Sequence, residues 1–136
     1  GTHICNINLN QHSHGHLYRS SLEGIAFSFM YGMEILKNDN AQINVIRAGN
    51  DNLFRSEIFS STVATLIGHE IDIYNTTGAF GAARASGILN DDFSSFRKKI
   101  TKNDHVMTFL PITDNSEYID AYARWKEDLN KILKNK

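Results

Sequence analysis

The chain has 136 residues, of which 41% are hydrophobic and 21% charged, and its formal net charge is -1. A chain of this composition can bury one ordinary core, so we expect one domain or part of one rather than a disordered or fibrous protein. The nearly balanced charge does not favour a nucleic acid or an anionic membrane as a partner. No apolar run approaches the roughly 20 residues that span a bilayer.

The first residues predict a strand and a buried cysteine. Residues 2–9 carry Ile4, Ile7 and Leu9 between polar side chains, which indicates a strand. The lone cysteine, Cys5, excludes an internal disulfide, and its apolar neighbours favour a buried, unreactive thiol over a nucleophile. A reducing compartment fits this, so we expect a cytoplasmic protein. The chain starts at Gly1, directly in this stretch and without a methionine, as expected of a fragment.

Residues 16–36 predict the strongest helix of the chain. Apolar side chains recur there at the spacing of three and four residues that is typical of one helical face, and further apolar residues widen that face. The recurring residues are Leu22, Ile25, Phe29, Met33 and Leu36, and the widening ones are Phe27, Met30 and Ile35. We therefore expect this helix to be covered on more than one side.

The stretch from Gln42 to Leu66 predicts a strand, a turn and a helix. The strand is expected at Ile43 to Ile46 and the turn at Ala48 to Asn52. Ser56 is expected to cap a helix that Gly68 closes, with Ile58, Phe59, Val63, Leu66 and Ile67 on one face. The turn would lie at the carboxyl end of a strand, where small residues let a ligand approach the backbone, so we take it as the candidate ligand site.

The rest of the chain continues the alternation of strands and helices. We expect a strand at residues 71–74, a helix rich in alanine and glycine at 79–86, a short helix at 91–99 with Phe93 and Phe96 inward, and an extended segment at 106–112. Asn115 or Ser116 would cap an amphipathic last helix with an apolar face of Tyr118, Ile119, Tyr122, Trp125, Leu129, Ile132 and Leu133. This order predicts the α/β class with a short, mostly parallel sheet flanked by helices and followed by a C-terminal amphipathic helix.

Two polar features could have either a chemical or a structural role. His12, His14 and His16 alternate and could bind a metal ion, but we favour caps of the following helix and solvent-facing side chains; a polar role in a substrate cleft stays open. Glu23 lies four residues after Arg19, and a structural ion pair is favoured there over a catalytic role. We assign no metal-binding residue.

No sequence motif identifies a catalytic residue. The chain lacks a nucleophile elbow, a Walker loop and a dinucleotide fingerprint. Several aspartates could act as a general base, but no spacing singles one out, and we assign none. The loop at Ala48 to Asn52 has a single glycine, so by itself it is an even choice between a nucleotide loop and a bare turn.

Four blocks resemble the carbohydrate kinases of the FGGY family, in the order in which that family carries them. His16 to Gly24 (HLYRSSLEG) is similar to the family signature HLxRAxLEG, with His12 in the place of an earlier histidine. Residues 46–52 (IRAGNDN) resemble its strand and glycine-rich adenosine loop, residues 56–59 (SEIF) its SPLW helix start, and residues 77–83 (TGAFGAA) its EGAAxGAA segment. The aromatic last helix is similar to the tails of xylulokinase-like members.

The resemblance implies the C-terminal half of an actin-like, ribonuclease-H-like ATPase domain. Residues 1–136 would be a C-terminal fragment of the nucleotide-binding domain without an internal boundary, and residues 90–136 an extension of the same domain. Such kinases transfer a phosphoryl group from Mg-ATP to a sugar hydroxyl, which implies D-xylulose or a related pentulose here. The resemblance places the catalytic base and the phosphate loops in a preceding part, so the fragment alone is expected to be inactive.

The resemblance also implies which residues border the nucleotide. Ala48, Gly49, Asn50 and Asn52 would form the adenosine side of the site, with Gly49 permitting backbone contact and the asparagine amides donating hydrogen bonds. ATP or ADP and a sugar would be the partners, and a homodimer is one alternative for the assembly state. Because Ala48 and Asn50 stand where the family has glycines, a non-catalytic binding or regulatory module on a kinase-like scaffold stays open as a second hypothesis.

Overall fold

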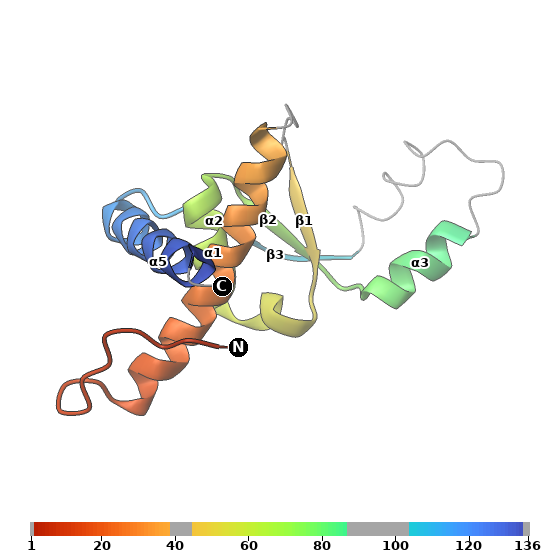
Figure 1. Cartoon of the computed structure of the whole chain (residues 1–136). Helices are drawn as coiled ribbons and strands as arrows, with labels where there is room; N and C mark the ends of the chain where they lie inside the picture. Colours follow the sequence, from red (N-terminus) through yellow and green to blue (C-terminus); the bar gives the residue numbers. More distant parts are fainter. Residues whose placement is uncertain (1, 39–44, 87–103, 135–136) are drawn as a thin grey trace.

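A three-stranded sheet and four α-helices make up the computed structural model, which describes residues 2–38, 45–86 and 104–134 (Figure 1). The elements in chain order are α1 (His14–Asn38), β1 (Ile46–Gly49), the 3-10 helix η1 (Asn52–Arg55), α2 (Glu57–Ile67), β2 (Ile71–Tyr74), α3 (Gly78–Ser86), β3 (His105–Phe109) and α5 (Ser116–Lys134). Helix α3 lies apart from the other helices in Figure 1. The predicted α/β mixture is confirmed. The helix expected at 91–99 lies outside the described residues.

The sheet has the order β1-β2-β3, with β2 in the centre. β1 and β2 are parallel, with Ile46 opposite Ile71 and Gly49 opposite Tyr74. β3 runs antiparallel to β2, and the pairing is irregular between Ile73 and Tyr74. The prediction of a mostly parallel sheet is therefore right for the first pair of strands and wrong for the second.

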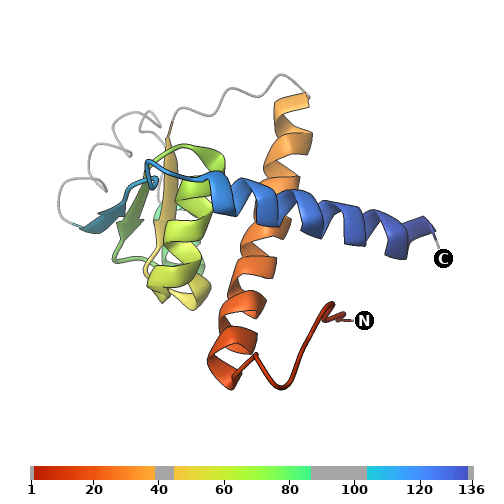
Figure 2. The same cartoon turned by 90° about the vertical axis from the view of Figure 1, so that its left-hand side faces the viewer.

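Helix α2 is buried on nearly every side: eight of its eleven residues are buried. It lies between the sheet and α1 (Figure 2). Both predicted caps are confirmed, because Oγ of Ser56 accepts the N–H of Phe59 at 3.4 Å and Gly68 closes the helix at a left-handed φ of 74°. Ile58 departs from the prediction, since it remains 40% exposed.

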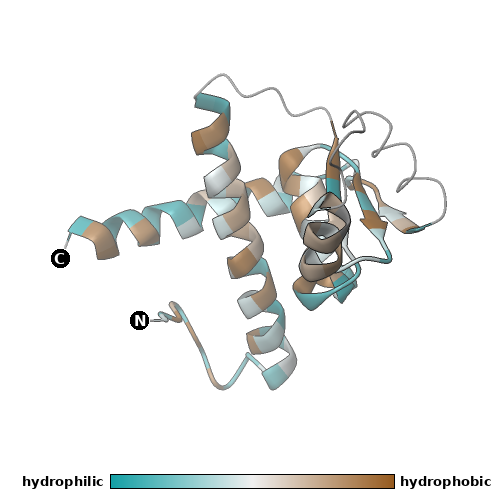
Figure 3. Ribbon diagram, turned by 90° about the vertical axis from the view of Figure 1, so that its right-hand side faces the viewer, coloured by the Kyte–Doolittle hydropathy of each residue, from teal (hydrophilic) through white to brown (hydrophobic). Residues whose placement is uncertain are grey.

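Helix α1 buries only part of the apolar face that its spacing predicted. Ala26 and Phe27 are its buried residues, and Leu22, Met30 and Met33 pack against the core cluster. As expected, the helix is covered on more than one side, by α2 and by α5, although Ile25, Ile35 and Leu36 remain exposed. Figure 3 shows hydrophobic residues along α1 beyond the part that packs on α2.

Helix α5 crosses α1 and is held there by an aromatic cluster and one ion pair (Figure 2). Tyr122 packs with Phe27 and Leu66 in a small second core. Nζ of Lys126 lies 2.8 Å from Oε2 of Glu34 on α1. Burial, together with the nearby Glu34 carboxylate, raises the pKa of the Tyr122 phenol well above its usual range.

The start of α5 selects Asn115 from the two predicted caps. The carbonyl of Asn115 accepts the N–H of Ile119 at 3.0 Å, which places Asn115 at the cap position. Ser116 is the first helical residue, and its hydroxyl donates to Asp114 at 2.8 Å rather than capping the helix.

The strand expected at residues 2–9 does not form, and Cys5 is exposed rather than buried. Asn6 has a left-handed φ of 59°, which interrupts an extended conformation, and Leu9 is 81% exposed. With no strand beside it in the described structure, this segment has nothing to bury its apolar side chains against.

The strand expected at Ile43 to Ile46 begins later than predicted. β1 starts at Ile46 and runs through Ala48 and Gly49, which were assigned to the turn. Val45 is exposed and precedes the strand, and Ile43 lies outside the described residues. Among the described residues, no helix combines the length and apolarity needed to cross a membrane.

Replacing Gly68 or Gly32 by alanine should change the stability of the chain in opposite directions. Neither added Cβ would have an atom within 4 Å, so the backbone conformation alone decides the sign. Gly68→Ala forces a side chain into the left-handed region and should cost about 1 kcal/mol of unfolding free energy. Gly32→Ala, within α1, should add roughly 0.5 to 1 kcal/mol. Urea denaturation of both variants measures this, and a shift of both in the same direction would contradict the assigned backbone conformations.

Candidate functional site

The carboxyl ends of the parallel strands β1 and β2 lie side by side and carry the candidate site. β1 leads into a turn at Asn50 and Asp51, and β2 leads into residues 75–77 before α3. The two loops are joined by a hydrogen bond of 2.7 Å from the N–H of Asn50 to the carbonyl of Tyr74. Adjacent carboxyl ends of parallel strands are the usual place for a ligand in an α/β protein.

Gly49 is the last residue of β1 and contacts the second loop closely. A Cβ at this position would clash with the carbonyl oxygen of Thr76 and would lie 3.3 Å from Oδ1 of Asp51. The N–H of Thr76 donates to the Tyr74 carbonyl at 2.8 Å, which fixes the position of that loop. Gly49 is therefore required by packing within the chain, whatever it contacts in a ligand.

The four residues predicted to border the nucleotide do not all share this edge. Ala48 pairs with Ile73 and packs against the core cluster, so its side chain points into the protein. Gly49, Asn50 and Asn52 lie together at the edge, and both asparagines are exposed. Asn52 has a φ of 49°, a left-handed conformation that asparagine tolerates better than most residues. The structure thus leaves the two amides exposed there, whereas the space beside Gly49 that a side chain would fill is taken by the Thr76 carbonyl.

The second loop was not included in the predicted site. Oγ1 of Thr77 accepts the N–H of Phe80 at 3.2 Å and so caps the start of α3. The Thr76 carbonyl lies against Gly49, as described above. A signal was present, because an asparagine, two threonines and a glycine follow the second parallel strand.

The other polar features have structural roles in the described residues. The predicted ion pair is confirmed: Nε of Arg19 lies 2.7 Å from Oε1 of Glu23, and this contact raises the pKa of Arg19. Nδ1 of His16 accepts the N–H of Ser13 at 3.1 Å, which confirms a histidine cap at the start of α1. Within residues 2–38, 45–86 and 104–134, no three His, Cys, Asp or Glu side chains group as metal ligands would.

Gly49→Ala should destabilise the chain by about 1 to 3 kcal/mol, because the methyl group displaces the Thr76 backbone. Gly78→Ala is the matched control, since a Cβ there has nothing within 4 Å and should change the stability by less than about 0.5 kcal/mol. Thermal unfolding followed by circular dichroism measures both. Equal effects of the two variants would show that the contact between the loops is not tight.

Comparison with known proteins finds a likeness in structure but not in sequence. No model of a protein family matches the chain, and no curated protein matches its sequence. Among solved structures, it is similar to the crystal structure of xylulose kinase from Rhodospirillum rubrum, with a TM-score of 0.68 and 18% identity. The match covers 96% of this chain and 26% of that chain. The chain therefore has the fold of about a quarter of a xylulose kinase.

Proposed function

We propose that the chain is part of an ATP-dependent sugar kinase of the FGGY type and supplies the adenosine side of its nucleotide site. The observation that carries this proposal is the structural likeness to a xylulose kinase over 96% of the chain. The sugar is then D-xylulose or a related pentulose, and the fold is that of an actin-like, ribonuclease-H-like domain. Mg-ATP is the co-substrate.

The edge formed by β1 and β2 suits a nucleoside rather than a charged group. Asn50 and Asn52 are exposed amides that can both donate to and accept from a base or a ribose. Gly49 leaves the strand end without a side chain. We propose that these three residues contact the adenosine, whereas Ala48 supports the strand from the core side.

Phosphoryl transfer would depend on residues outside this chain. The structural match spans only 26% of the xylulose kinase chain, so three quarters of that protein have no counterpart here. Phosphoryl transfer relies on a positioned base, metal ions and phosphate-binding loops. We place these groups in the remainder of a longer protein, and the chain alone should not phosphorylate a sugar.

Adenosine binding to the chain tests this proposal. Isothermal titration should give similar dissociation constants for adenosine, ADP and Mg-ATP, because the contacts of this chain are to the nucleoside alone. Asn50→Ala and Asn52→Gly should each weaken adenosine binding about threefold to tenfold, as expected for one lost hydrogen bond. Glycine is used at position 52 because it keeps the φ of 49°.

A matched control removes an amide elsewhere. Asn130 is exposed on α5, and Asn130→Ala should leave adenosine binding unchanged. If the asparagine variants at the edge bind as tightly as the Asn130 variant, the loop is not the nucleoside site. If none of the three ligands binds, the adenosine assignment fails.

The second hypothesis is a non-catalytic binding or regulatory module on the same scaffold. It is favoured by Ala48 and Asn50, which stand where the resembled family has glycines; of the two side chains, that of Asn50 is exposed at the strand end, whereas that of Ala48 packs on the core. An assay of the full-length protein with D-xylulose and Mg-ATP separates the two. Formation of a sugar phosphate supports the kinase, whereas nucleotide binding without transfer supports the module.

A further inference from the structure

Asp51 places an unpaired carboxylate at the strand edge. It follows Asn50 in the turn after β1 and directly precedes the 3-10 helix η1. Its side chain is partly exposed. In the part of the chain that the structure describes, this carboxylate forms neither a hydrogen bond nor an ion pair. Because an ionised carboxylate accepts hydrogen bonds through both of its oxygens, Asp51 can receive donors from a ligand.

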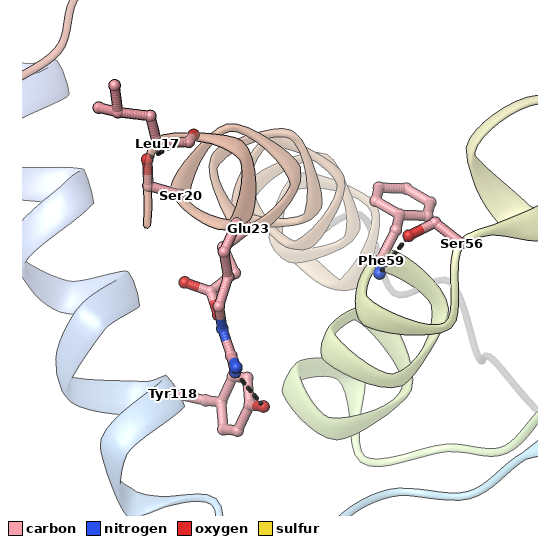
Figure 4. A network of polar contacts seen from close by, with 7 residues as sticks. Leu17, Ser20, Glu23, Ser56, Phe59 and Tyr118 are labelled. Atoms are coloured by element: carbon pink, nitrogen blue, oxygen red, sulfur yellow. Dashed lines mark hydrogen bonds and ion pairs between the residues drawn. The ribbon is translucent and has the colours of Figure 1, made fainter. Parts of the chain in front are cut away.

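The position of Asp51 would normally pair its carboxylate with the backbone. It is the cap residue of η1, with an extended φ of -139° and ψ of 170°, and an aspartate at such a place usually accepts an N–H of the following turn. Ser56 does so at the start of α2, where its Oγ accepts the N–H of Phe59 (Figure 4). Asp51 makes no such bond. Its two oxygens are therefore left for another partner.

The carboxylate of Asp51 lies beside Gly49. Its Oδ1 is 3.3 Å from the position that a Cβ of Gly49 would take, and the carbonyl oxygen of Thr76 contacts the same position. A carboxylate and a carbonyl, which both only accept hydrogen bonds, thus border one small space at the ends of β1 and β2. A ligand group that suits this space carries hydrogen-bond donors.

The proposed nucleoside has such donors in two places, the adenine amino group and the ribose hydroxyls. An asparagine amide both donates and accepts, which matches the adenine edge, where an amino group lies next to a ring nitrogen. A carboxylate only accepts, and its two oxygens match the two neighbouring hydroxyls of a ribose. A phosphate group would be repelled by the negative charge of Asp51. Ribose is therefore the part of the nucleoside that suits Asp51 best.

We propose that Asp51 binds the ribose hydroxyls of the nucleoside and makes the site select ribonucleosides over deoxyribonucleosides. This inference rests on the proposed adenosine site and adds to it the group that binds the ribose. The 2′ and 3′ hydroxyls donate to the carboxylate of Asp51, while the amides of Asn50 and Asn52 contact the base. Hydrogen bonds to an ionised group are stronger than those between neutral groups, so the loss of one hydroxyl weakens binding measurably.

Isothermal titration of the chain with adenosine, 2′-deoxyadenosine and 3′-deoxyadenosine tests the inference. The unmodified chain should bind adenosine about tenfold more tightly than either deoxynucleoside, as expected for one charge-assisted hydrogen bond. Asp51→Ala should weaken adenosine binding the most, so that the three nucleosides bind about equally. Asp51→Asn keeps the size of the side chain but loses its charge, and it should reduce the preference to about threefold.

A matched control removes a carboxylate elsewhere. Asp120 is exposed on α5 and likewise forms no hydrogen bond or ion pair among the described residues. Asp120→Ala should therefore keep the full preference for adenosine. Far-UV circular dichroism first shows that each variant is folded.

The ratio of the dissociation constants separates a contact with ribose from a general effect on the fold. A substitution that merely loosens the edge weakens all three nucleosides equally and leaves the ratio unchanged. Equal binding of the three by the unmodified chain would overturn the inference and leave the adenosine site in place, as would a preference that persists in Asp51→Ala. If adenosine itself does not bind, the adenosine site is wrong, and the role of Asp51 is wrong with it.

Discussion

The burial of α2 between the sheet and α1 is the constraint on which the rest of the structure depends. Its Phe59 and Val63 share one cluster with Ile71 and Ile73 of β2 and with Ala26 of α1. Because α2 contacts both the sheet and α1, a shift of either neighbour would open a cavity beside α2 or overlap its side chains. The strand edge and the α1–α5 crossing therefore take their positions from the same helix.

The sequence predicted the features that depend on a few neighbouring residues. Ser56 and Gly68 bound α2 as expected, because a cap requires only residues within about one helical turn. The strand predicted at residues 2–9 was wrong because a strand needs a neighbouring strand, and local spacing cannot reveal one. The error at Cys5 followed, because its burial was inferred from that strand. Which part of the apolar pattern of α1 is buried was likewise set by the helices that pack on it, because Leu22 and Met33 reach the core whereas Ile25 and Leu36 stay exposed.

The candidate edge was found from sequence, but the function of its individual atoms was not. Residues 48–52 do lie at the carboxyl end of a parallel strand. Whether Ala48 faces the core or the ligand depends on the register of β1 against β2, which the strand alone does not encode. The contact of Gly49 with the Thr76 backbone could not be read from sequence either, because it joins two loops separated by a whole helix and strand.

The strand edge and the α1–α5 crossing are attached to opposite ends of α2 and can be altered separately. At its N-terminal end, Oγ of Ser60 donates to the carbonyl of Phe54, which ties α2 to the turn after β1. At its C-terminal end, Leu66 packs with Phe27 and Tyr122 at the α1–α5 crossing. Changes to exposed charges on α5 leave that packing intact, so they need not affect the edge. A cavity within α2 would disturb both, since the same helix holds them in place.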